Sequence, residues 1–177
     1  MTRLAAVLAL ALLPAPGAAQ VAEPDGYRMD SYRAPVPETL AGATVISPGQ
    51  AHDLWQAGAV FVDVLPRAPR PDSLPEGTIW NEKPRLSVPG AVWLPNVGYG
   101  AIADVTDAYF RAGLAQAAPD PATPVVFFCL AECWMSWNAA KRALEYGYGA
   151  VHWMPDGTDG WVFHDYPTAP VVPWQAP

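Results

Sequence analysis

The sequence of 177 residues predicts a single α/β domain built on a parallel sheet. Short apolar runs typical of strands alternate along the chain with segments whose apolar residues recur at helical spacing. Hydrophobic residues make up 51% and charged residues 15%, which provides material for a core and excludes disorder throughout. The net charge of −7 argues against nucleic-acid binding and anionic membrane surfaces, because both select for basic patches.

The first 19 residues have the pattern of an export signal. Arg3 provides a positive start, residues 4–13 form an unbroken apolar run, and residues 14–19 supply a helix breaker and small residues suited to signal peptidase. We therefore expect cleavage after Ala19 and a periplasmic location, where cysteines do not stay reduced without help. No later run of about 18 apolar residues occurs, so no membrane span is expected in the mature chain.

The first elements follow an irregular arm at residues 20–42. Residues 44–46 predict a short strand, and residues 49–57 predict a helix. Ser47 fits the N-cap of that helix, with Pro48 as its first residue, and Gly58 ends it.

A long connection interrupts the middle of the chain. The nearly continuous apolar run 60–64 predicts a strand covered on both faces. Residues 66–89 hold six prolines and little periodicity, so we expect an irregular excursion there. Residues 91–94 predict the next strand, and 107–117 have the helical spacing.

The last third carries the clearest pattern. Residues 125–128 form the most strand-like run, and 136–146 predict an amphipathic helix that ends at Gly147. Residues 151–154 predict a further strand, and 155–160, with two Asp-Gly pairs, predict a turn. The expected organisation is a signal at 1–19, an arm at 20–42, one domain at 43–165 and a Pro-rich tail at 166–177, either wrapped around the domain or flexible.

Two cysteines lie where a parallel sheet collects functional groups. Cys129 ends the strand 125–128, just before a helix whose N-terminus favours thiolate, and Cys133 follows four residues later. Backbone N–H groups of the intervening loop are expected to converge on the Cys129 sulfur. An ordinary buried cysteine at a strand end is the alternative.

The pair is also spaced to form a disulfide. Residues four apart on one helical turn lie about 6 Å apart, within the disulfide range. Closing so short a loop adds only about 2 kcal/mol to stability. Reversible redox chemistry, with one sulfur attacking and the other resolving, therefore explains the pair better than stapling does.

Several stretches together resemble rhodanese-like domains. They are Val60-Phe61-Val62-Asp63-Val64, residues 88–95, 125–129 and 147–161, in the order seen in that family. The segment Cys133-Trp134-Met135-Ser136-Trp137 more narrowly resembles the exported PQQ-dependent catabolism-associated CXXCW motif proteins. Three residues separate the cysteines here, not two, which departs from that motif.

The resemblance implies a fold and roles. It implies an open parallel sheet with helices on both faces, Cys129 as the nucleophile that carries a persulfide, and Asp63 as a residue that orders nearby backbone. In the redox interpretation of the pair, Cys133 is the resolving thiol. Rhodaneses that act on thiosulfate have Arg or Lys in the cysteine loop, whereas residues 130–137 have neither and contain Glu132. A carboxylate about 6 Å from a bound anion repels it by about 3 kcal/mol, so simple thiosulfate sulfurtransferase activity is not expected.

The cysteine loop also supplies candidate binding residues. Trp134 and Trp137 flank the thiols and are candidates for a wall against a flat organic ligand or a docking protein, with Glu132 and Ser136 beside them. Packing is the alternative for the two tryptophans, and the commoner role of such rings.

No metal or other cofactor is expected, and a copper site is the alternative. Cys129 and Cys133 with His152 or His164 would provide a Cys2His set for copper. A histidine in a strand is more often a hydrogen-bonded core residue. The spacing of Asp156, Asp159 and Asp165 does not fit an EF-hand.

The leading hypothesis is a periplasmic thiol/disulfide or persulfide protein. By resemblance, it serves quinoprotein-dependent alcohol catabolism, with a dehydrogenase, a cytochrome or an assembly factor as its partner. One alternative is a non-catalytic binding or assembly module with a structural disulfide, and a second is a copper-handling protein.

Overall fold

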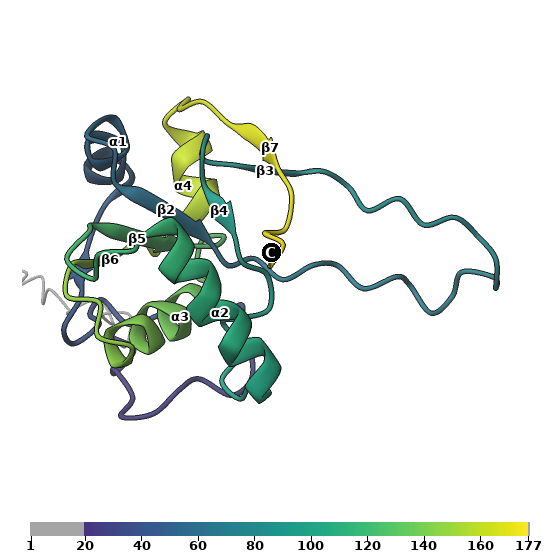
Figure 1. Cartoon of the computed structure of the whole chain (residues 1–177), viewed down its shortest axis with the longest axis horizontal. Helices are drawn as coiled ribbons and strands as arrows, with labels where there is room; N and C mark the ends of the chain where they lie inside the picture. Colours follow the sequence, from purple (N-terminus) through teal and green to yellow (C-terminus); the bar gives the residue numbers. More distant parts are fainter. Residues whose placement is uncertain (1–19, 177) are drawn as a thin grey trace, which may run out of the picture.

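The computed structural model describes residues 20–176, so the expected export signal lies outside the described residues. A five-stranded parallel sheet has the order β1-β6-β5-β2-β4, and β3 pairs with β7 in a separate antiparallel ribbon (Figure 1). The elements are β1 (Thr44–Val45), α1 (Pro48–Gln56), β2 (Val60–Asp63), β3 (Arg85–Ser87), β4 (Val92–Trp93), α2 (Asp104–Ala117), β5 (Val125–Phe128), α3 (Trp134–Glu145), β6 (Val151–Trp153), α4 (Gly157–Phe163) and β7 (Ala169–Val171).

Helices cover both faces of the sheet, as the predicted fold class requires. The central strand β5 is fully buried and sends alternate side chains to opposite faces. Val125 and Phe127 pack into one core with side chains of α2 and α3, whereas Val126 and Phe128 pack into a second core with α1 and α4. In Figure 1, α1 and α4 lie above the sheet and α2 and α3 lie below it. The prediction of an open parallel sheet with helices on both faces is confirmed.

Local signals placed the first helix correctly. Ser47 accepts a hydrogen bond from the Gln50 amide, and the Gln50 side chain accepts one from the Ser47 amide, which completes a capping box. The chain leaves the helix through Gly58, whose φ of +84° suits glycine. The other two predicted helices begin earlier than expected, α2 at Asp104 and α3 at Trp134.

The predicted turn at 155–160 is wrong, because α4 begins there. Asp-Gly pairs favour turns locally, but the segment buries Trp161 completely. The Trp161 ring packs edge-on against Trp55 of α1, with ring centroids 5.9 Å apart. Burial of a large aromatic side chain thus overrides the local turn preference.

The excursion and the tail also meet in a way that local pattern did not predict. β3 lies at the end of the Pro-rich excursion, and it pairs with β7 of the C-terminal tail. The tail is therefore wrapped against the domain, the first of the two possibilities. Residues 66–84 leave the body of the molecule as a long loop and return (Figure 1).

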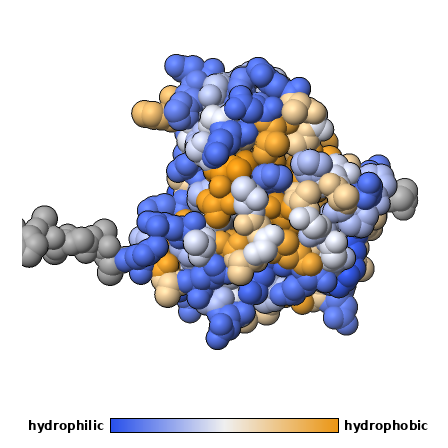
Figure 2. Space-filling view, turned by 90° about the vertical axis from the view of Figure 1, so that its left-hand side faces the viewer, coloured by the Kyte–Doolittle hydropathy of each residue, from blue (hydrophilic) through white to orange (hydrophobic). Residues whose placement is uncertain are grey.

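The face of the molecule away from the excursion has an apolar centre. Viewed from the side away from the excursion, apolar residues gather in the middle of the face and hydrophilic residues surround them (Figure 2). Within residues 20–176, no helix combines the length and hydropathy needed to cross a membrane.

Candidate functional site: the Cys129–Cys133 turn

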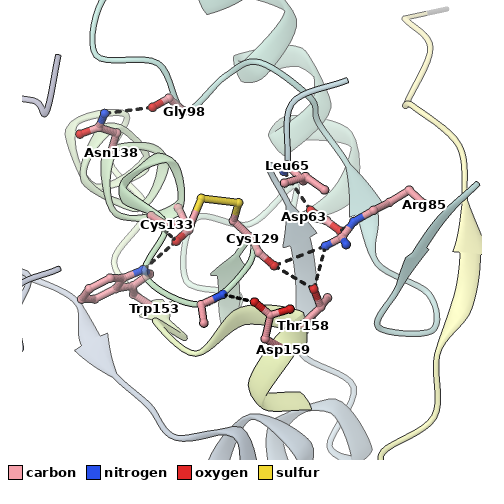
Figure 3. The surroundings of a disulfide bond; sticks show 12 residues. Asp63, Leu65, Arg85, Gly98, Cys129, Cys133, Asn138, Trp153, Thr158 and Asp159 are labelled. Atoms are coloured by element: carbon pink, nitrogen blue, oxygen red, sulfur yellow. Dashed lines mark hydrogen bonds and ion pairs between the residues drawn. A yellow bond between two sulfur atoms is a disulfide. The ribbon is translucent and has the colours of Figure 1, made fainter. Parts of the chain in front are cut away.

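Cys129 and Cys133 form a disulfide at the carboxyl end of the central strand (Figure 3). Cys129 follows β5 directly, and Cys133 is the N-cap residue of α3. Their Cα atoms lie 6.1 Å apart, as the spacing predicted. Both cysteines are buried, so the disulfide is shielded from solvent.

Three donors converge on the carbonyl oxygen of Cys129. The Thr158 amide donates to it at 3.0 Å, and the Thr158 hydroxyl lies 3.2 Å away. Arg85 Nη2 donates to the same oxygen at 3.3 Å (Figure 3). The start of the cysteine turn is therefore fixed by α4 on one side and by β3 on the other.

Arg85 is held by a fully buried carboxylate. Asp63 Oδ2 accepts hydrogen bonds from Arg85 Nε at 2.7 Å and from the Ser87 hydroxyl at 2.6 Å. Asp63 Oδ1 accepts from the Leu65 amide at 2.9 Å, which agrees with the expectation that Asp63 orders nearby backbone. A buried Asp needs a cationic or N–H partner, and that requirement was the signal that could have pointed to Arg85.

The amides of the cysteine turn have acceptors other than the Cys129 sulfur. The Ala131 amide donates to Asp159 Oδ2 at 3.0 Å, and the Trp134 amide donates to the Tyr32 carbonyl at 2.9 Å. The Ser136 amide donates to the Cys133 carbonyl at 3.2 Å. The expected convergence of loop amides on the Cys129 sulfur is therefore not seen for these three groups.

The charges at the turn disfavour a bound anion. The Asp159 carboxylate lies against the Ala131 amide, and Glu132 is exposed with a φ of +51°. Two arginines also lie at the turn. Arg85, which is paired with Asp63, donates to the Cys129 carbonyl, and Arg33 of the arm has an exposed side chain and a backbone bridge to Cys133. With Asp63 included, three carboxylates and two arginines surround the turn, which leaves a net negative charge against an anion.

Gly157 allows α4 to approach the turn closely. Its φ is +52°, and a Cβ atom at this position would collide with the backbone of Leu130 and with the carbonyl oxygen of Cys129. Only glycine satisfies both the left-handed conformation and this contact. The close approach brings Thr158 and Asp159 to the cysteine turn.

The N-terminal arm closes the other side of the turn. The Ala34 amide donates to the Glu132 carbonyl at 3.3 Å, next to the Tyr32–Trp134 hydrogen bond described above. The Asn138 side chain binds both the N–H and the carbonyl of Arg28, each at 2.9 Å. The same amide nitrogen of Asn138 also donates to the Gly98 carbonyl at 2.9 Å. Asn138 thus links the arm to α3 and to the loop before α2.

The tryptophans proposed as a ligand wall are packed beneath this arm. Trp134 and Trp137 are buried, with ring centroids 5.5 Å apart. Their indole N–H groups donate to arm carbonyls, Trp134 to Pro35 and Trp137 to Thr39, each at 3.1 Å. Ser136 is buried too, and it joins the Cys133 carbonyl to Trp153 Nε1. These contacts fit the packing alternative.

The far end of α3 anchors the arm and α2. Burial, and then a hydrogen bond to Glu145, raise the pKa of Tyr27 in the arm. The hydroxyl of Tyr146 donates to Asp107 of α2, and this hydrogen bond, followed by one from Arg111, lowers the pKa of Asp107.

Possible metal ligands do not cluster in the part of the chain that the structure describes. Across residues 20–176, no group of three or more His, Cys, Asp or Glu side chains is placed to hold a metal ion. His152 lies on β6 beside β5, as expected, with Nδ1 3.2 Å from the Ala150 carbonyl, and His164 stacks on Tyr166. Among residues 20–176, no third ligand for the copper hypothesis lies beside the two sulfurs.

Two of the solved structures with a similar fold are described as sulfurtransferases. No protein-family model and no curated protein sequence matches the chain. The polysulfide-sulfur transferase homodimer of Wolinella succinogenes is 21% identical, with a TM-score of 0.47, over 73% of this chain and 80% of that chain. A thiosulfate sulfurtransferase of Pseudomonas aeruginosa is 21% identical, with a TM-score of 0.50, over 74% of this chain but only 21% of that chain. The second likeness, together with the strand order and the helices on both faces, shows that this chain has the rhodanese-like fold.

Proposed function

We propose that this protein is a rhodanese-like thiol/disulfide protein and that the Cys129–Cys133 bridge is the oxidised form of its working redox pair. The observation that carries the proposal is the position of the bridge, which joins the end of β5 to the N-cap of α3. Functional groups in parallel α/β sheets collect at this edge. A bridge over so short a loop contributes only about 2 kcal/mol as a staple, so stabilisation is a weak reason for it.

The exchange reaction needs a partner that supplies two thiols. A partner thiolate attacks one sulfur of the bridge, a mixed disulfide forms, and the other cysteine leaves as a thiolate. The second partner thiol then displaces the first, which leaves Cys129 and Cys133 reduced and the partner oxidised. Two electrons and two protons pass from the partner to this chain. In the reduced form Cys129 is the nucleophile and Cys133 the resolving thiol.

The reduced form can also give a persulfide on Cys129, when the Cys129 thiolate attacks the outer sulfur of a sulfane donor such as a persulfide and the rest of the donor leaves as a thiolate. Its sulfur donor is expected to be a protein or a neutral carrier, because Glu132 and Asp159 place negative charge at the turn. The proposed setting is the periplasm, in quinoprotein-dependent alcohol oxidation, and it rests on the export pattern of residues 1–19 and on the resemblance of the Cys-Trp segment. A dehydrogenase, a cytochrome or an assembly factor is the proposed partner.

The reduction potential of the pair tests the proposal. The oxidised protein is equilibrated in dithiothreitol buffers, free thiols are trapped, and Cys129 and Cys133 are quantified by mass spectrometry. Reversible reduction above about −250 mV supports a working pair, because structural bridges lie below about −300 mV. A potential below that mark, or two free thiols in protein isolated under oxidising conditions, contradicts it.

One observation favours a second candidate, a non-catalytic binding module with a structural disulfide. Both cysteines are buried and the arm is hydrogen-bonded across Cys133, so a partner reaches the bridge only if the arm moves. A Cys129→Ser variant that retains full function in cells would support this module, whereas loss of function in a variant that folds normally would favour the redox pair.

A further inference from the structure

A pocket lies at the base of the excursion, on the side of the turn away from the N-terminal arm. It has a volume of about 440 Å3, within the range of small-molecule sites. Both limbs of the excursion contribute to it, and the Arg67–Glu82 ion pair, at 2.8 Å, joins those limbs. Its floor includes Trp93 of β4 and Arg85 of β3, the strand at the end of the excursion.

The walls of the pocket are mostly apolar. Trp80 and Trp93 both line it, together with Leu65, Pro66 and Leu86. Trp93 is buried and its indole N–H already donates to the Leu65 carbonyl at 2.7 Å, so its ring contributes apolar surface. Trp80 is 38% exposed, with part of its ring free to contact a ligand. Such surfaces favour a flat, apolar ligand body.

The floor of the pocket carries an unused donor. Arg85 uses Nε for Asp63 and Nη2 for Cys129 and Thr158. Its Nη1 has no acceptor among residues 20–176, and that part of the chain contains no buried side-chain nitrogen without a partner. Nη1 is therefore at least partly exposed, and Arg85 is one of the residues that line the pocket, with its guanidinium plane already fixed by the three other groups.

The charge balance of the pocket favours an anion. Asp63 balances Arg85, and Arg67 balances Glu82. Lys83, also in the lining, is exposed and forms no ion pair with any described residue. One uncompensated positive charge thus faces the pocket in a chain whose net charge is −7.

We propose that this pocket binds a small aromatic monocarboxylate. The aromatic ring packs on Trp80 and Trp93, and the carboxylate accepts a hydrogen bond from Arg85 Nη1 beside Lys83. A single carboxylate matches the single uncompensated charge. This site is separate from the redox pair, although Arg85 also contacts the Cys129 carbonyl, so the site stands or falls independently of the proposed redox function.

The test uses 2-naphthoate as the probe and its uncharged analogue 2-naphthalenemethanol as the comparison. Binding to the full oxidised protein is measured by calorimetry and by shifts of tryptophan indole N–H resonances. We expect saturable binding of 2-naphthoate, and binding of the alcohol at least about tenfold weaker, because the alcohol lacks the charge. Trp80→Ala should lower the affinity for 2-naphthoate by about tenfold, and Lys83→Ala should lower it by about threefold.

Neither variant should impair folding, so a change in binding can be assigned to the pocket. Trp80 and Lys83 are both exposed, whereas Arg85 is left in place because it completes a buried ion pair. Lys141→Ala is the matched control, since Lys141 lies over the Trp137 ring on α3, and it should leave binding unchanged. No binding of 2-naphthoate, equal binding of the alcohol, or full binding by Trp80→Ala would each overturn the proposal.

Discussion

The two flanks of the Cys129–Cys133 turn differ in packing, because one is covered by the N-terminal arm and the other borders an open pocket. On the arm flank, the arm forms hydrogen bonds with the residues on either side of Cys133. The side chains of Trp134, Ser136 and Trp137 are buried on this flank. On the excursion flank, Arg85 reaches the Cys129 carbonyl and still has a donor facing an open pocket. The sulfurs are therefore buried under neighbouring elements that include the arm, whereas the pocket that Arg85 lines is open.

The largest expected loss of stability follows from removing the buried carboxylate of the excursion flank. Asp63→Ala leaves Arg85 without its buried carboxylate and should lower the free energy of unfolding by about 3–5 kcal/mol, measured by urea denaturation. Glu82→Ala removes the partner of a more exposed arginine and should cost less than about 1 kcal/mol. Equal losses for the two variants would mean that the buried pair does not hold this flank.

The next effect concerns the contact between α4 and the turn, which lies between the flanks. Gly157→Ala should lower stability by about 3 kcal/mol, because it adds a collision with the turn backbone to the cost of positive φ. Gly147→Ala is the control, since Gly147 has a φ of +95° and open space around its Cβ position, and it should cost about 1 kcal/mol. The difference between the two losses of unfolding free energy, measured by denaturant unfolding, gives the cost of the collision. Similar losses for the two variants would show that no such collision occurs.

A smaller effect is expected when the arm flank is loosened. Asn138→Ala removes the hydrogen bonds to Arg28 and Gly98, and a loss of about 1.4 kcal/mol in arm docking raises the open population about tenfold. The disulfide should then be reduced by dithiothreitol about tenfold faster, as followed by thiol trapping.

The control variant removes a hydrogen bond between α2 and the tail, away from the arm. Gln116→Ala loses one contact to Trp174 and should leave the reduction rate unchanged. If Asn138→Ala also leaves the rate unchanged, the arm does not protect the bridge.

The smallest effect lies far from both flanks and depends on pH. The pKa of Asp107 is lowered in the folded state, so its stabilising contribution is present above the unfolded pKa of about 4 and disappears as pH falls through the folded pKa. Asp107→Asn should therefore cost about 1 kcal/mol at pH 7, mainly through the Tyr146 hydrogen bond, and much less at strongly acidic pH. Unfolding at both pH values tests the sign, and a cost that grows in acid would contradict it.

Prediction from the sequence succeeded where neighbouring residues decide the structure. Ser47, Pro48 and Gly58 bound α1 as predicted, because a capping box and a glycine exit are local chemistry. The spacing of Cys129 and Cys133 likewise sufficed to predict a possible bridge. It failed for α4, where burial of Trp161 against another helix outweighs two Asp-Gly pairs.

By itself, the sequence determined the five strands of the parallel sheet, the first three helices between them and the position of the cysteine pair at the end of a strand. Apolar periodicity and turn residues carry that information within windows of a few residues. Only the tertiary structure decided what surrounds the pair. Arg85 comes from a Pro-rich segment 44 residues before Cys129, and Pro35 of the arm lies 99 residues before its partner Trp134. Contacts over such separations depend on how whole elements pack, and that packing closes one flank of the turn and leaves a charged donor open on the other.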